Sequence, residues 1–414
     1  MNVTPTTTGA ARPATYRDVF AAAESRVLFG SFGVFMVGET VKMIALSVLV
    51  YERTGSGLLS ALAYVTAFLP HALGGVFMLA LADRWPPRAV IVGYDLLRLA
   101  TVVILALGVL SPAGMLVLAA AVGLFAPVSN AARAALLPEV LPGDAYVLGR
   151  SLLTIAAGGT QVVGFALGGV LLGWIGPYGA LWATAATCAL SALLVRAGLA
   201  PRPSRTGRDG SGAVRETWRI NRALLADRRI RGLLLAQWLP GSLFVGAEGV
   251  AVPYAAGLGP GASAGVLLMA AAFGMLLGNL LVGRFVGPAH REAWTPWLAL
   301  LLGVPMLTFV ARPGLWLAAV LFAAATAGFA YQLGLARRFL DAVPQARRGQ
   351  AFGLLSAGLM TIQGLAATVG GALSDVFGPG TVMALAGAAS LVATLALWRV
   401  LAPQRRSTNP DDHG

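Results

Sequence analysis

Lysine and cysteine are almost missing from this chain of 414 residues, and each scarcity excludes a class of site. The one lysine is Lys42, so the chain cannot form a phosphate-binding loop of the GxxxxGK type, and ATP hydrolysis by such a loop is excluded. The one cysteine, Cys188, permits no disulfide within the chain and argues against a cysteine-based zinc site. Together with the features described below, these scarcities lead us to predict no enzyme, no metal site and no cofactor.

Charged residues are also scarce: they make up 11% of the chain, against 57% hydrophobic residues and a mean hydropathy of +0.77. A water-soluble fold of this composition would have too little polar surface to cover itself. Crossing about 30 Å of hydrocarbon takes roughly 20 apolar residues in a helix. Twelve such runs predict an all-α membrane protein, with spans near residues 27–50, 57–81, 89–110, 113–132, 151–173, 178–195, 232–256, 262–283, 295–310, 314–336, 351–373 and 380–398.

The distribution of arginine predicts the orientation, because positive residues are enriched in short cytoplasmic loops. With the amino terminus inside, the cytoplasmic segments carry 26 of the 30 basic residues, so both termini are expected in the cytoplasm. Topology and anionic lipid headgroups account for the net charge of +13, and we expect no nucleic-acid partner. Residues 1–26 have no apolar core, which predicts a cytoplasmic tail rather than a signal peptide.

The longest polar stretch divides the twelve spans into six and six. The predicted domains are the tail 1–26, a bundle of six helices at 27–195, a cytoplasmic linker at 196–231, a second bundle of six at 232–398, and a cytoplasmic tail at 399–414. A shift of 202 residues superposes Gly168 and Gly169 on Gly370 and Gly371, and also Gly176-Pro177 on Gly378-Pro379. A shift of 209 pairs Glu39 with Glu248. Parallel repeats of six spans are typical of transporters whose halves move around a site at their interface.

Several stretches resemble the major facilitator superfamily, specifically its bacterial drug and siderophore exporter branch, which includes macrolide efflux pumps and the enterobactin exporter. The most specific are "LVYERTGSGLLSALAYVTAFLPHALGG", "LADRWPPRAVIVGYDLLRLA" and "GGTQVVGFALGGVLLGWIGP". The resemblance covers nearly the whole chain. It implies the major facilitator fold, transport by alternating access and export of a small amphipathic molecule.

Two motifs of that family are partly matched. Asp83, Arg84 and Arg88 match its cytoplasmic latch between spans two and three, although Leu79 and Pro86 replace its glycines. The alternative interpretation is that these arginines only anchor the loop at the cytoplasmic surface. The antiporter motif of span five is matched by three glycines for helix packing and gating, with counterparts in span eleven, while Phe165 replaces its proline: Gly164, Gly168, Gly169, Gly370 and Gly371.

Acidic residues inside spans are costly and are functional candidates. Glu39 and Glu248 are the predicted sites of proton or substrate coupling, and Lys42 lies one turn from Glu39 on the same helix face. The alternative for Glu39 is a neutralising ion pair with Lys42, and the alternative for Glu248 is a place at the membrane interface. Lys42 could instead bias the cavity toward an anionic substrate.

The remaining polar candidates have structural alternatives. Asp95 and Arg98, three residues apart, are predicted to support the latch rather than to bind substrate. Buried amides and aromatic residues could line a substrate cavity, or join helices and face lipid: Gln161, Gln363, Gln237, Trp238, Phe244 and Tyr331.

The sequence thus predicts a monomeric secondary exporter in the bacterial cytoplasmic membrane that exchanges protons for an amphipathic drug, antibiotic, natural product or siderophore. The proton gradient is its expected energy source, and membrane lipids are its expected surroundings. A proton-coupled importer, a lipid or lysolipid flippase of the same fold, and a non-transporting membrane sensor are the alternatives.

Overall fold

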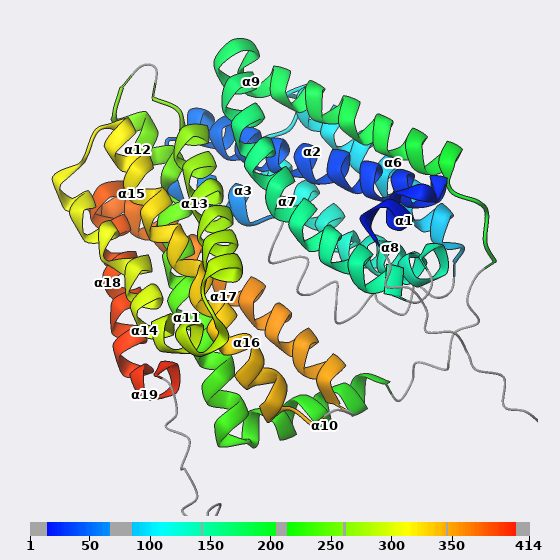
Figure 1. The fold of residues 1–414 in the computed structure, drawn as a ribbon. Coiled ribbons are helices and arrows are strands. Elements are labelled where there is room, and N and C mark those ends of the chain that lie inside the picture. The colour runs from blue at the N-terminus through cyan, green and yellow to red at the C-terminus, as the bar shows by residue number, and fades with distance from the viewer. Residues whose placement is uncertain are drawn as a thin grey trace, which may run out of the picture.

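The computed structural model describes residues 15–66, 85–141, 144–203, 213–259, 262–344 and 347–402. These residues form helices and connecting turns, without a strand in the described ranges. Figure 1 shows two groups of helices side by side, one from each half of the sequence. The all-α prediction is confirmed.

The first group contains α1 (Tyr16–Ala21), α2 (Ala23–Thr54), α3 (Gly57–Val65), α6 (Pro87–Ala106), α7 (Pro112–Gly123), α8 (Ala126–Val140) and α9 (Asp144–Gly198). Helix α10 (Ala213–Ala226) lies in the predicted linker. The second group contains α11 (Arg228–Glu248), α12 (Ala251–Gly257), α13 (Ala264–Phe285), α14 (Pro288–Gly303), η1 (Pro305–Ala311), α15 (Leu315–Ala327), η2 (Gly328–Ala330), α16 (Tyr331–Ala342), α17 (Arg348–Phe377), α18 (Pro379–Ala396) and α19 (Trp398–Leu401).

Ten helical segments of the described chain are long and apolar enough to cross a membrane. One of them holds two predicted spans, because Gly176 interrupts α9 with φ 68° and ψ 179° before Pro177. The predicted span at 57–81 begins as α3 and continues outside the described residues. The segments therefore fit the twelve spans of the sequence prediction.

Glycine, proline and serine set the helix ends. Gly55 ends α2 in the left-handed conformation, with φ 65°, and the side chain of Ser56 then caps the start of α3 by accepting from the Leu59 amide at 3.3 Å. Gly378 has φ 80° between α17 and Pro379, at the position that matches Gly176 in the repeat. The duplicated Gly-Pro pairs therefore mark equivalent bends in the two halves.

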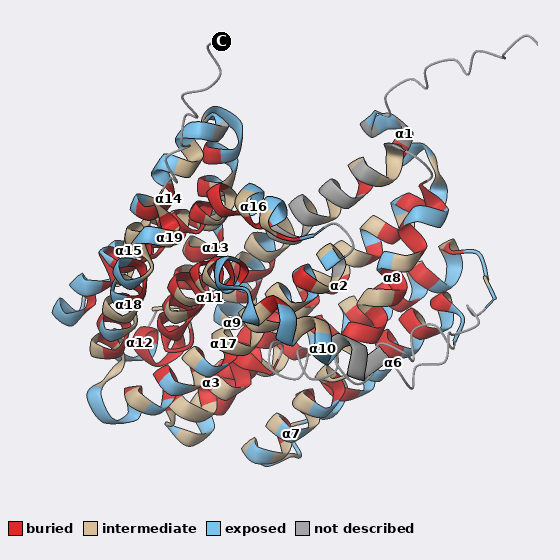
Figure 2. Ribbon diagram, turned by 90° about the horizontal axis from the view of Figure 1, so that it is seen from below, coloured by how far each residue is buried: buried red, intermediate tan, exposed pale blue. Residues whose placement is uncertain are grey.

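Buried residues gather inside each group of helices (Figure 2). Large apolar side chains such as Trp174, Phe285 and Trp316 remain 84%, 78% and 75% exposed, as expected for surfaces that face lipid. The two halves touch where α3 packs on α17 and where α9 packs on α13, with smaller contacts of α12 on α2 and α3. These contacts form the interface between the two halves.

Candidate functional site

Glu39 is the centre of a buried ion-pair network rather than a lone acid. Its Oε1 accepts from Lys42 Nζ at 2.5 Å, and its Oε2 accepts from Arg98 Nη2 at 2.7 Å. The Glu39 side chain is 20% exposed, that of Lys42 is 12% exposed and that of Arg98 is 2% exposed. The accessible surface of these three side chains thus lies mainly at Glu39 and Lys42.

Asp95 extends this network to α8 and α9 of the same half. It is fully buried on α6, with Arg98 Nη1 at 3.6 Å and Arg133 Nη2 of α8 at 3.4 Å, and it accepts from Ser191 Oγ of α9 at 2.7 Å. Arg133 also donates to Ser31 Oγ at 2.8 Å. A buried charge needs such partners, because desolvating it alone costs several kcal/mol or more.

The N-terminal charge cluster is defined here as Glu39, Lys42, Asp95, Arg98 and Arg133. Three bases against two acids give it one excess positive charge when all five are ionised. The Phe35 ring lies under two guanidinium groups, 4.2 Å from Arg98 Cζ and 5.4 Å from Arg133 Cζ, which adds a cation–π attraction. The cluster is therefore preorganised around fixed charges.

Of the predicted latch residues, the described structure includes Arg88, Asp95 and Arg98. Arg98 forms ion pairs with Asp95 and with Glu39, and the predicted support of the latch by Asp95 and Arg98 stays a prediction. Arg88 donates to the Arg196 main-chain oxygen at the end of α9. Asp83 and Arg84 lie outside the described residues.

Arg133 is a further member of this buried network, and the sequence analysis did not single it out. It lies inside α8 and is only 4% exposed. Its pairing with Asp95 could not be seen in the sequence, because the two residues come from different helices.

Glu248 has surroundings unlike those of its repeat mate Glu39. It lies half-buried at the end of α11, and its Oε2 accepts from the hydroxyl of Tyr64 at 3.2 Å. Tyr64 belongs to α3, so this hydrogen bond joins the two halves. No salt bridge to Glu248 occurs in the described part of the chain. One duplicated acid is thus paired with two cations and the other faces a neutral hydroxyl.

The glycines predicted to serve packing lie where helices approach closely. A Cβ on Gly164 would come within 2.7 Å of Thr40 Cβ, and one on Gly168 within 3.0 Å of Ile44 Cδ1, both on α2 of the same half. Gly370 repeats this contact against the Gly246 carbonyl of α11, where a Cβ would lie at 2.6 Å. The repeat therefore preserves a close packing of helices: span five packs on span one, and span eleven packs on span seven.

The neighbouring glycine of each pair packs across the two halves. A Cβ on Gly169 would lie 3.2 Å from Gly265 Cα of α13, and one on Gly371 would lie 2.5 Å from Ala61 Cβ of α3. Close approach of small residues is what allows helices to pack where lipid gives no hydrophobic drive. Two seams, α9–α13 and α3–α17, thus join the halves.

The predicted cavity aromatics pack in the interior of the second half instead. Phe244 and Tyr331 are fully buried, and Trp238 is 9% exposed with its Nε1 donating to the Leu355 carbonyl at 2.9 Å. The Tyr331 hydroxyl donates to the carbonyl of Gln237, itself a buried residue, at 2.9 Å. Gln161 and Gln363 are half-buried on α9 and α17. The four buried residues therefore stabilise the bundle.

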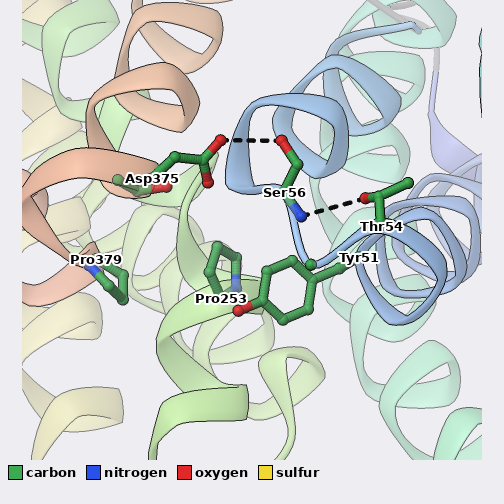
Figure 3. Close-up of a pocket in the computed structure, with 8 residues that line it drawn as sticks. Tyr51, Thr54, Ser56, Pro253, Asp375 and Pro379 are labelled. Carbon is green, nitrogen blue, oxygen red and sulfur yellow. Dashed lines mark hydrogen bonds between the residues drawn. The ribbon is translucent and has the colours of Figure 1, made fainter.

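A cavity of about 400 Å³ lies beside the α3–α17 seam, and none of the predicted cavity residues lines it. Figure 3 shows Asp375 of α17 facing Ser56 across this seam, with Tyr51 and Pro253 below. The carboxylate of Asp375 accepts from Ser56 Oγ at 2.9 Å, from the Gly57 amide at 2.5 Å and from the Leu58 amide at 3.3 Å. Sequence reasoning missed Asp375 and Tyr64; the signal available for Asp375 was an acid three residues before a duplicated Gly-Pro pair.

Comparisons with known proteins agree with this architecture. The model of the Major Facilitator Superfamily matches residues 27–336. A search of curated proteins finds no match. The chain is similar in fold to the solved structure of the nucleoside transporter NupG, with 16% identity and a TM-score of 0.67, covering 91% of this chain and 99% of that one.

Two further solved structures show the same fold. The xylose transporter XylE from E. coli, inward open, has 14% identity and a TM-score of 0.65 over 93% of this chain and 98% of that one. A POT family transporter in complex with a thioalcohol-conjugated peptide has 11% identity and a TM-score of 0.67 over 90% and 95%. The family match spans well over half of the sequence, and the apolar helices agree with it. The chain is therefore a multi-pass membrane protein that belongs to the major facilitator superfamily of transporters.

Proposed function

We propose that this protein is a secondary active transporter that exports a small amphipathic molecule by proton antiport and alternating access. Drugs, antibiotics, natural products and siderophores are the substrate classes in view. The protein acts as a monomer without a cofactor, in a bacterial cytoplasmic membrane with both termini in the cytoplasm.

The observation that carries the proton coupling is the contrast between Glu248 and Glu39. Protonating Glu39 would leave Lys42 and Arg98 facing each other without a carboxylate between them, which costs free energy in a buried site. Protonating Glu248 separates no ion pair, because its contact is the Tyr64 hydroxyl. We therefore propose that Glu248 carries the proton, and that the N-terminal charge cluster keeps a fixed charge that substrate meets at the Glu39–Lys42 edge.

The position of Glu248 also supports a role in the transport cycle. An acid that contacts the opposite half can change its contact when it binds or releases a proton, and this changes the relative stability of two arrangements of the halves. An acid that contacts only its own half does not change the relative stability of these arrangements in this way. The outward direction rests on the sequence resemblance to exporters, and the orientation rests on the arginine distribution.

The test requires a substrate, which a resistance panel in a pump-deficient bacterial host would supply. The purified protein in proteoliposomes is then assayed for substrate-driven proton movement with a pH-sensitive dye inside the vesicles. We expect Glu248→Gln to lose the pH-gradient-driven component while substrate still exchanges downhill. Asp341→Asn, a change at a 60% exposed acid on α16, is the control and should behave as wild type. Full pH-driven transport by Glu248→Gln would refute the assignment.

A proton-coupled importer is the second candidate. Solved structures of similar fold include a D-xylose–proton symporter, with 16% identity and a TM-score of 0.67 over 91% of this chain and 97% of that one. Whole-cell accumulation of the identified compound decides between the two directions. Accumulation that falls on expression supports export, and accumulation that rises supports import.

A further inference from the structure

Helix α3 presents one face to the other half of the molecule. Gly57, Ala61 and Tyr64 are spaced by four and three residues, which places them on the same side of a helix. Each of the three contacts the second half at a different level. Together they form a row along α3 that we call the cross-half face.

At the start of α3, Asp375 caps the helix from the other half. The first amides of a helix have no partner within the helix, and a carboxylate there also meets the positive end of the helix dipole. The Gly57 and Leu58 amides and the Ser56 hydroxyl all donate to Asp375, and these four residues are called the clasp from here on. Charge-assisted hydrogen bonds of this kind are about twice as strong as neutral ones.

Close packing surrounds the clasp. A Cβ on Gly57 would lie 2.1 Å from Ser374 Oγ, and one on Gly371 would lie 2.5 Å from Ala61 Cβ and 2.7 Å from the Gly57 carbonyl. The backbones of α3 and α17 therefore meet directly, and the clasp cannot loosen gradually. A small separation of the helices would break its hydrogen bonds together.

At the far end of the cross-half face, Tyr64 donates to Glu248. Among the described titratable groups, Tyr64 is the one that acts on Glu248. In the described residues, the helices that pack on α11 bring no charged group to this carboxylate: α10, α14, α16, α17, α18 and α19. A carboxylate is a stronger acceptor than a neutral carboxyl group, so protonation of Glu248 weakens the hold on Tyr64. The short helix α3 is thus held at one end by the clasp and near the other by the acid proposed to carry the proton.

We propose that α3 links protonation of Glu248 to release of the clasp, and that Asp375 is the positioning residue that keeps this end of the two halves together. This inference rests on the proposed role of Glu248. In the second seam, a shift of 202 residues places Gly173, and not an acid, at the position of Asp375. The clasp is therefore a feature of one seam, added to the duplicated frame.

The separation of the halves at the clasp end can be measured by double electron–electron resonance between two spin labels in lipid nanodiscs. Spin labels at Val109 and Trp316 report it, because both side chains are about three-quarters exposed and belong to opposite halves. The buried Cys188 is replaced by Ala beforehand. We expect Asp375→Ala to raise the ratio of long to short distances about tenfold, as the loss of charge-assisted hydrogen bonds implies. Asp341→Ala is the control and should leave the distances unchanged.

A milder variant protects the test against misfolding. Ser56→Ala removes one of the three hydrogen bonds of the clasp, together with the cap on the Leu59 amide, and leaves the carboxylate and both clasp amides in place. We expect a smaller shift in the same direction. Distances identical to wild type in both Asp375→Ala and Ser56→Ala would overturn the clasp.

The link to Glu248 is tested by acidification in the same samples. We expect mildly acidic buffer to lengthen the distances in the wild type, and expect Tyr64→Phe and Glu248→Gln to abolish this response. Tyr331→Phe is the control: it removes a buried hydrogen bond of a tyrosine hydroxyl within one half, and this variant should keep the response to acid. An unchanged acid response in Tyr64→Phe would overturn the role of α3.

These outcomes are separable from those of the proposed function. The distance measurement needs no substrate, and proton transport is read independently in vesicles. If Glu248→Gln loses proton transport while Tyr64→Phe responds to acid as the wild type does, Glu248 is supported as the proton site and the proposed role of α3 is refuted. If Glu248→Gln keeps full proton transport, the proposed function falls, and the effect of Asp375→Ala alone still decides the clasp.

Discussion

Glu39→Gln should destabilise the fold far more than Glu248→Gln, although the two acids are equivalent in the repeat. In the wild type, Glu39 stands between Lys42 at 2.5 Å and Arg98 at 2.7 Å. Breaking a buried ion pair by removing one partner costs about 3–5 kcal/mol. Since Glu39 is 20% exposed and Arg98 keeps Asp95, we expect a loss of about 2–3 kcal/mol in the free energy of unfolding.

Glu248→Gln leaves the Tyr64 hydroxyl with an amide oxygen to donate to, and leaves no cation without a partner. The expected loss is about 1 kcal/mol or less, the scale of one neutral hydrogen bond. Stability and proton coupling should thus separate: the glutamine at 39 weakens the fold, and the glutamine at 248 weakens the coupling.

The chain carries its own reporter for this measurement. Cys188 is the one cysteine and has no exposed surface, so a dye that becomes fluorescent on reaction with thiols reports unfolding of the first half in detergent. Glu39→Gln should unfold at a clearly lower temperature than Glu248→Gln. Adding Lys42→Met to Glu39→Gln removes one unpaired cation and should recover part of the loss. Equal unfolding temperatures for the two glutamine variants would refute the reasoning.

Three further changes probe the site and the seams. Lys42→Met leaves two acids and two bases in the N-terminal charge cluster, so we expect a small change in unfolding temperature and, in a resistance panel, a loss of preference for acidic compounds. Gly265→Val places a Cβ 2.4 Å from Gly169 Cα, which should abolish transport in vesicles while dye accessibility of the folded protein stays unchanged. A Cβ at Gly173 meets nothing within 4 Å, so Gly173→Asp should be tolerated and, by giving the second seam the acid that Asp375 gives the first, should reduce the long-distance population of the spin labels.

Much of the fold could be predicted from the sequence, because a bilayer permits few solutions. Apolar runs of about 20 residues must be helices there, since each backbone polar group needs a partner within its own segment. Gly176-Pro177 and Gly378-Pro379 marked the bends between spans, and the structure gives both glycines positive φ angles. The linker and domain boundaries between residues 195 and 231 stay predictions.

The site was less predictable, because helix spacing reveals neighbours on one helix only. Three-residue spacing identified the Glu39–Lys42 pair and the Asp95–Arg98 pair, and both are present. The bridge from Arg98 to Glu39 depends on how α2 and α6 pack, which no local pattern contains. The ion pair between Arg133 and Asp95 joins α8 and α6 and was missed for the same reason.

The cross-half contacts were invisible for a related reason. In the sequence, Tyr64 is one residue of an apolar span, and Asp375 is a polar residue near the end of another span. Their partners lie far away in the sequence, at Glu248 and at Gly57. Only the three-dimensional structure shows that both belong to one interface.

The unequal seams have a consequence for how the molecule moves. The α9–α13 seam is held by the contact of Gly169 with Gly265, whose small surfaces can pivot with little loss of interaction. The α3–α17 seam is held by directional bonds to Asp375 that break within a short separation. Opening should therefore be asymmetric. The halves should rotate about the α9–α13 contact, and the α3–α17 seam should separate once the hydrogen bonds to Asp375 break.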